Sequence, residues 1–176
     1  KNLRLVEVRA GALDEPVVDG AGRLFVNGFT DSNDLPLANP GGTTHFQPAL
    51  GGVGDFLITR FDAANQLEWS TYYGGSSNEG FAGYTGKTLD LDAQGRLYMT
   101  GMTASSDFPL QNGPGRFNQP TAGGGNDAML LHFANDGTRL WATFLGRPAT
   151  DFGRSVHVAA NGCLYSVGET QDDAGP

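Results

Sequence analysis

The stretch "GRLYMTGMTASSDFPL", residues Gly95–Leu110, decides the fold of this chain because it occurs nearly unchanged a second time. "GRLFVNGFTDSNDLPL" covers Gly22–Leu37, and a shorter copy, "GCLYSVGET", begins at Gly162. The first glycines of the three copies are 73 and 67 residues apart. Self-similarity at a long, nearly fixed spacing indicates a chain built from repeated structural units.

Other segments recur in the same order. "GGVGDFLITRFD" from Gly51 matches "GGGNDAMLLHFA" from Gly123, and "LEWSTYYGG" from Leu67 matches "RLWATFLGR" from Arg139, each 72 residues later. The spacing shortens to 67 within the loop "GGSSNEGFAGYTG" that follows Tyr73. A length difference confined to a loop is typical of a true structural repeat.

Each unit contains four strand-like runs, recognised by alternation and by β-branched or aromatic content. The turns "DAQG" and "ANDG" join the first and second pairs, and their Gly and Asn residues tolerate the left-handed conformation of hairpin turns. No segment shows a helical period. Four antiparallel strands repeated along a chain predict an all-β fold made of β-propeller blades. In the central unit the predicted strands are Lys87–Leu91, Arg96–Thr103, Asp127–Phe133 and Arg139–Leu145.

The linked motifs "LDLDAQGRLY", "GRLYMTGMTASSDFP", "GGGNDAMLLHF" and "LEWSTYYGG" resemble the bacterial SBBP-type β-propeller repeat family. The resemblance covers residues 12 to 170. Arg23 and Arg96 stand where that family usually has Asn, Leu35 replaces a Phe, and "GRPATDFG" replaces a Gly-Gly loop. The resemblance implies a secreted or cell-surface bacterial protein whose repeats present loops as a binding scaffold.

We expect one propeller segment over residues 1–176. It divides into 1–15, a strand of a preceding blade ("LRLVEVR", Leu3–Arg9), then repeat one at 16–86, repeat two at 87–154 and the start of repeat three at 155–176. About two and a half repeats are too few to close a ring, which takes four to eight blades. The chain is therefore either a fragment of a longer propeller, or one of several copies that assemble, or an arc that stays open. We favour the fragment, because an open blade edge exposes unpaired backbone.

The charge balance disfavours some partners. Nineteen acidic and eleven basic residues give a formal net charge of −8. An acidic surface repels phosphate backbones and anionic lipid headgroups, so we expect neither nucleic acid binding nor membrane insertion. Cys163 is the only cysteine, so no disulfide forms within the chain.

The segment "DLDAQG" places Asp90 and Asp92 before a glycine, as at the start of a calcium loop. The twelfth position of such a loop would be Gly101, which carries no carboxylate, and only Asp92 has an acidic counterpart, Asp19. A polar hairpin turn is the favoured interpretation. We therefore expect no metal site and no cofactor.

No catalytic constellation is visible. The histidines lack the spacing of a zinc site, and no Gly-x-Ser-x-Gly elbow supports a nucleophile. Several candidates recur once per unit, which favours structural roles: turn formation for the aspartates and packing between blades for the aromatics. The residues considered are His45, His132 and His157, the pairs Asp34/Asp107 and Asp55/Asp127, and the pair Trp69/Trp141.

Three functions remain open at this stage. The favoured one is a non-catalytic scaffold that binds a protein or glycan partner. A second is part of a larger propeller enzyme acting on polysaccharide through a central channel, with Glu79, Tyr84 and Lys87 of the single non-repeated insertion as the first suspects. A third is self-assembly into a homo-oligomer through open blade edges.

Overall fold

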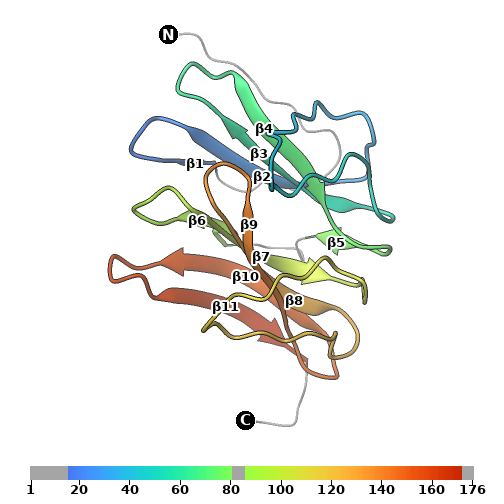
Figure 1. Ribbon diagram of the computed structural model, residues 1–176. Helices are drawn as coiled ribbons and strands as arrows, with labels where there is room; N and C mark the ends of the chain where they lie inside the picture. Colours follow the sequence, from blue (N-terminus) through green and yellow to red (C-terminus); the bar gives the residue numbers. More distant parts are fainter. Residues whose placement is uncertain (1–15, 81–85, 172–176) are drawn as a thin grey trace.

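The computed structural model describes residues 16–80 and 86–171, and in this part of the chain every regular element is a β-strand (Figure 1). The all-β prediction is therefore confirmed. The strands are β1 (Val17–Val18), β2 (Leu24–Thr30), β3 (Asp55–Phe61), β4 (Leu67–Tyr73), β5 (Glu79–Gly80), β6 (Leu89–Leu91), β7 (Leu97–Thr103), β8 (Asp127–Phe133), β9 (Arg139–Leu145), β10 (Asp151–Val158) and β11 (Leu164–Thr170).

The strands form three antiparallel sheets. The first has the order β1-β2-β3-β4, and the second has the order β6-β7-β8-β9, with β5 also paired to β7. The third contains only β10 and β11. Figure 1 shows the sheets one above another in chain order. The predicted strands of the central unit match β6 to β9 to within two residues.

The register repeats along with the sequence. Thr30 at the end of β2 lies opposite Asp55 at the start of β3, and Thr103 lies opposite Asp127 in the same way. A bulge occurs at the same place in both units, after Arg60 and after His132. The four-stranded meanders β1–β4 and β6–β9 are therefore structural copies, as the internal repeat predicts.

The tight turns all lie at one end of the sheets, which we call the hairpin face. Gly22, Gly95 and Gly162 close the β1–β2, β6–β7 and β10–β11 turns with positive φ angles of 79°, 71° and 82°. A residue with a side chain is strained in this conformation, so the glycine of the repeated motif is a conformational requirement. The long loops 31–54 and 104–126 leave from the opposite ends of β2 and β7.

These long loops cover the outer edges of two sheets. Ala38 and Gln47 bridge to β4 at Ser70 and Tyr72, and Gln111 bridges to β9 at Ala142. Covered edges do not template pairing with another chain. In each unit, the loop between the second and third strands therefore covers the outer edge of the fourth strand, β4 or β9.

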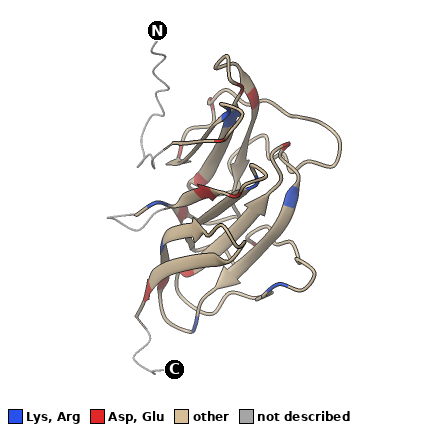
Figure 2. Cartoon of the chain, turned by 90° about the vertical axis from the view of Figure 1, so that its left-hand side faces the viewer, with Lys and Arg blue, Asp and Glu red and all other residues tan. Residues whose placement is uncertain are grey.

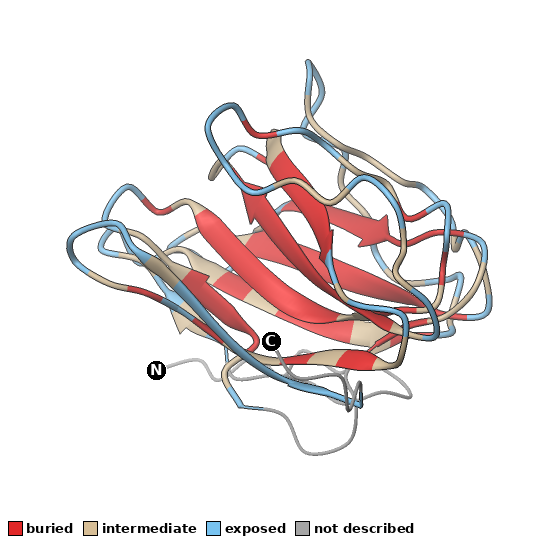
Figure 3. Ribbon diagram, turned by 90° about the horizontal axis from the view of Figure 1, so that it is seen from below, coloured by how far each residue is buried: buried red, intermediate tan, exposed pale blue. Residues whose placement is uncertain are grey.

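The main core lies between the first and second sheets, and Figure 3 shows buried residues running along the strands while turns and loops are exposed. Phe133 of β8 packs against Trp69 and Tyr73 of β4, with ring centroids 6.3 Å and 5.7 Å apart. A polar link crosses the same junction, where Asn27 donates its side-chain amide to Thr88 Oγ1 at 2.9 Å. Trp69 therefore packs between the first and second sheets, whereas Trp141 lies under its own loop with its indole donating to Phe117 O.

A matched hydrogen-bond network holds each long loop to its sheet. The backbone N–H of Gln47 donates to Thr71 Oγ1 at 2.8 Å, and that of Gln119 donates to Thr143 Oγ1 at 2.7 Å. Both glutamine side chains also accept from the glycine that follows the fourth strand, at 3.1 Å. Sequence comparison of the units did not single out these glutamines, although both precede a proline.

One predicted strand lies outside the described residues, and the predicted limits of the repeats differ from the pairing of the strands. Leu3–Arg9 lies outside the described residues. The boundary drawn between residues 154 and 155 falls inside β10, and β5, within the range 16–86, pairs with β7 of the second sheet. Cys163, the residue after the β10–β11 turn glycine, is exposed.

Candidate functional site on the hairpin face

A cavity of about 590 Å³ lies between the turns of the first and second units. One wall comes from the β1–β2 hairpin, with Asp19 and Arg23, and the other from β6 and its turn, with Asp90, Asp92 and Gln94. Its volume is within the range of pockets that hold small ligands. Polar and charged side chains therefore face a space large enough for a ligand.

The β1–β2 and β6–β7 turns are each built around an Asp–Arg pair. Asp19 accepts from the backbone N–H groups of Ala21 and Arg23 at 2.9 and 3.0 Å, and Arg23 Nε donates to it at 2.7 Å. Asp92 and Arg96 repeat this arrangement, with Nε donating at 2.6 Å. Burial raises the pKa of Asp92, but the hydrogen bonds and charge of Arg96 outweigh it, so its pKa is lowered. The pairs stay charged at neutral pH and fix the walls of the cavity.

The turns also pack against each other. A Cβ placed on Gly95 would lie 3.2 Å from Asp19 Oδ2 and 3.3 Å from Arg23 Nη2. The Asp–Arg pair of the first unit therefore rests on the turn glycine of the second. The third unit has Ala159 and Cys163 at these two positions and cannot form the pair.

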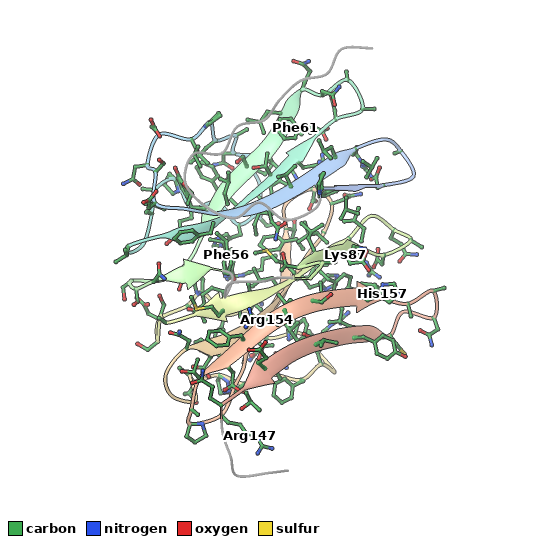
Figure 4. All side chains as sticks on the ribbon, turned by 180° about the vertical axis from the view of Figure 1, so that it is seen from behind. Phe56, Phe61, Lys87, Arg147, Arg154 and His157 are labelled. Carbon is green, nitrogen blue, oxygen red and sulfur yellow. The ribbon has the colours of Figure 1, made fainter. Side chains whose placement is uncertain are left out.

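Asp90 connects the second sheet to the third. Its carboxylate forms an ion pair with Lys87, accepts the backbone N–H of Val158 at 2.8 Å, and lies 3.0 Å from Nδ1 of His157. Figure 4 shows Lys87, which precedes β6, and His157 of β10 from behind. Burial alone would raise the pKa of Asp90. The hydrogen bonds from Lys87, Val158 and Leu91 outweigh the effect of burial, so the pKa of Asp90 is lowered.

The cluster Lys87–Asp90–His157 is not repeated. By the repeat spacing, Asp90 corresponds to Val17 in the first unit and to His157 in the third. His157 is exposed, with its Nδ1 held by a carboxylate that is itself almost buried. A carboxylate–imidazole pair of this kind orients the ring and leaves Nε2 available to a ligand or a reacting group.

The three candidate residues of the insertion, Glu79, Tyr84 and Lys87, do not form one site among the described residues. Lys87 belongs to the cluster, whereas Tyr84 lies outside the described residues. Glu79 lies at the start of β5 and is not exposed. Its side chain is fully buried, it accepts from Thr103 Oγ1 at 2.6 Å, and Asp151 occupies the equivalent place at the next junction.

Three further sequence candidates, Asp55, Asp107 and His132, have structural partners. Asp107 accepts from Ser76 N and Oγ at 2.8 and 3.0 Å, and Asp55 accepts from Gly51 N at 2.9 Å. His132 is buried, stacks on Tyr98 with centroids 4.1 Å apart, and its pKa is lowered by burial to about 4. Among residues 16–80 and 86–171, no three His, Cys, Asp or Glu side chains gather as metal ligands.

The contact of His157 could have been recognised from the sequence, because Asp90 and His157 fall at equivalent positions of β6 and β10 in the repeat. Side chains at one register position of neighbouring repeats lie next to each other. The repeated turns and the insertion are the stronger signals in the sequence, so this pair does not stand out from them.

The charged residues of the described chain are spread over the sheets and turns rather than gathered on one face (Figure 2). The described residues contain no helix with the length and hydropathy required for a membrane span. No protein-family model matches this chain. A comparison with curated proteins likewise found no match.

Proposed function

We propose that the chain is a segment of a β-propeller whose sheets are its blades, and that it serves as a non-catalytic binding scaffold. In this proposal it belongs to a secreted or cell-surface bacterial protein and binds a protein or glycan partner through the hairpin face. The support for blades is the repeated four-stranded antiparallel meander with matched register. The resemblance to the SBBP-type repeat supports the location and the scaffold role.

The cavity of about 590 Å³ between the first two hairpins carries the binding part of the proposal. Its walls are made rigid by Asp19–Arg23 and by Asp92, and the exposed Gln94 accepts a hydrogen bond from Arg96 Nη2 through its Oε1 at 3.1 Å. Hydroxyl-rich ligands need several donors and acceptors at fixed positions, and a rigid frame supplies these with little loss of entropy. A short glycan is therefore the ligand class we favour for this cavity.

The test is an NMR titration of the ¹⁵N-labelled chain with neutral tetrasaccharides of glucose, N-acetylglucosamine and mannose. We expect at least one to shift amide signals of residues 17–23 and 90–95, and Gln94→Ala to weaken that binding. Gln66→Ala is the matched control, because Gln66 is an exposed glutamine in the β3–β4 turn and does not line the cavity. Shifts confined to the loops 31–54 and 104–126, or no shifts at all, would contradict the glycan assignment.

A second candidate is an enzyme site of a larger propeller acting on polysaccharide. The observation in its favour is the non-repeated pair of Asp90 and His157, whose geometry suits a general base. If this candidate is right, His157→Gln abolishes polysaccharide cleavage by the longest natural form of the protein while glycan binding persists. Unchanged cleavage in the variant would exclude it. Homo-oligomer formation through open edges, the third candidate, predicts a sedimentation coefficient that rises with concentration.

A further inference from the structure

Two buried carboxyl groups meet where the first sheet passes into the second, at the end of the sheets opposite the hairpin face. Asp55 is the first residue of β3, and Glu79 is the first residue of β5, which pairs with β7. Both residues are 0% exposed. A Cβ on Gly74 would lie 2.6 Å from Asp55 Oδ1 and closer still to Glu79 Oε2, so these two oxygens flank the same point. The fold therefore brings two acidic groups together away from water.

Three of the four carboxyl oxygens have a hydrogen-bond donor. Asp55 Oδ2 accepts from the backbone N–H of Gly51 at 2.9 Å. Glu79 Oε1 accepts from Thr103 Oγ1 at 2.6 Å, and Glu79 Oε2 accepts from the backbone N–H of Gly75 at 3.0 Å. Asp55 Oδ1 is buried and has no donor within the described residues. Because a buried acceptor without a donor is costly, this oxygen needs a hydrogen, and the group in reach is the other carboxyl.

The surroundings offer no positive charge to the two acids. The ion pairs of residues 16–80 and 86–171 include neither Asp55 nor Glu79. The groups that lie next to the pair are Thr30 of β2, Tyr72 of β4, Thr103 of β7, Gln47 of the loop 31–54, and Ser105 and Asp107 of the loop 104–126. Of these, Tyr72 is neutral because burial raises its pKa, and Asp107 is negative because hydrogen bonds from Ser76 lower its pKa. Two buried carboxylates without a counter-charge do not both stay ionised.

We propose that Asp55 and Glu79 share a single proton and form a pH-sensitive latch between the first sheet and the crossing segment, residues 74–80, that leads to the second sheet. Glu79 carries the proton and donates it to Asp55 Oδ1. Burial raises the pKa of both carboxyls, hydrogen bonding with Glu79 lowers that of Asp55, and the charge of Asp55 raises that of Glu79 further. The latch is at the opposite end of the sheets from the cavity, so it does not depend on a ligand there.

The latch holds the end of the loop 31–54 against the crossing segment. The backbone N–H of Val53 donates to Ser77 O at 2.8 Å, and that of Glu79 donates to Gly54 O at 2.9 Å. Since the net pKa of each carboxyl is above its ordinary value, the folded chain keeps the proton at pH values where the unfolded chain has lost it. The stability that the pair contributes is therefore present at low pH and is lost as pH rises through the raised pKa. Two buried negative charges then repel, and these contacts loosen.

The next junction has the same placement without the shared proton. Asp127 begins β8 as Asp55 begins β3, and Asp151 begins β10. Burial raises the pKa of Asp127 and the charge of Asp151 adds to the rise, but these two side chains form no hydrogen bond with each other in the described structure. Aspartate is one methylene shorter than glutamate, so the longer side chain of Glu79 is what makes the first junction a direct contact.

The experiment is a ¹³C NMR titration of the side-chain carboxyl carbons of the whole chain. We expect Asp55 Cγ and Glu79 Cδ to report one common step above pH 4.5, because coupled groups titrate as a pair. Across that step, protection of the Gly51 and Gly75 amides from hydrogen exchange should fall at least about tenfold after correction for the intrinsic exchange rate. Separate steps at ordinary carboxyl pKa values, or unchanged protection, would overturn the proposal. A step that millimolar calcium moves to lower pH would also overturn it, by showing that a cation joins the pair.

Two variants separate the pair from its surroundings. Glu79→Gln supplies Asp55 Oδ1 with a neutral donor that does not titrate, so the Asp55 step should move to lower pH and Gly51 should stay protected. Asp107→Asn is the matched control, because Asp107 binds Ser76 on the same crossing segment but does not share the proton, and it should keep the common step. If Glu79→Gln disturbs folding, the titration of the wild type carries the test. A common step that persists in Glu79→Gln or disappears in Asp107→Asn contradicts the latch.

Discussion

The ring of Phe56 lies against the backbone of Gly101, so that a Cβ on this glycine would be 2.7 Å from the ring and 3.0 Å from the carbonyl oxygen of Gly80. Gly101 is in the middle of β7, where a glycine would otherwise weaken the strand. The close contact between the first and second sheets explains why the repeat motif has glycine at this position.

We therefore expect Gly101→Ala to lower the free energy of unfolding by about 1–3 kcal/mol, the usual cost of adding a methyl group to a packed core. Urea unfolding followed by tryptophan fluorescence measures the change. Gly20→Ala is the control, because no atom lies within 4 Å of a Cβ at that position. Equal stability of Gly101→Ala and the wild type would show that the two sheets separate easily.

Glu79 provides a pH-dependent prediction. Burial raises the pKa of Glu79, hydrogen bonds from Ser105 and Thr103 oppose the rise, and the charge of Asp55 adds to it. Because the folded-state pKa is above the ordinary value of 4.5, the stability from this group is present below 4.5 and is lost as pH rises through the raised pKa. Glu79→Gln should thus gain stability relative to the wild type as pH increases.

The measurement is the difference in unfolding free energy between Glu79→Gln and the wild type at a series of pH values from about 4 to about 8. Glu68→Gln, a substitution at the partly exposed side chain that pairs with Arg60, controls for the loss of a glutamate. A difference that stays constant with pH would mean that Glu79 titrates alike in the folded and unfolded chain.

The strands and turns could be predicted because their pattern is local and is written more than once. Alternation within "LYMTGMT" and the positive φ of Gly95 both follow from neighbouring residues. The contact of Asp90 with His157 joins residues far apart in the chain, and the burial of Glu79 depends on Thr103 of the adjacent strand. Such contacts follow from how sheets pack, which one unit's pattern does not specify.

The Asp–Arg turns lead to a stability prediction. Asp92 accepts from the backbone N–H groups of Gln94 and Arg96 at 2.9 and 3.0 Å and is almost buried. Asp92→Ala should cost about 1–3 kcal/mol, because two backbone donors and the guanidinium lose their acceptor. Arg96→Gln should cost less, since the pair is partly exposed and the turn keeps its backbone hydrogen bonds. Thermal unfolding of both variants measures this, and equal losses would contradict it.

His132 determines part of the response to acid. Neither of its ring nitrogens has a hydrogen-bond partner, and burial lowers its pKa from 6.5 to about 4. As pH falls below 6.5, the unfolded chain takes up a proton that the folded chain does not, so stability falls by about 1.4 kcal/mol per pH unit until the folded pKa is reached. His132→Phe keeps the ring that stacks on Tyr98 and removes this loss.

We expect His132→Phe to match or exceed the wild type in stability at neutral pH and to lose less stability between pH 6.5 and about 4. Part of the acid sensitivity should remain, because burial also lowers the pKa of His45 to about 4. Urea unfolding across this range measures the difference, with His157→Phe as the exposed control. If His132→Phe and the wild type lose stability in parallel, then His132 is charged within the folded chain and its stacking on Tyr98 is a cation–π contact rather than a neutral one.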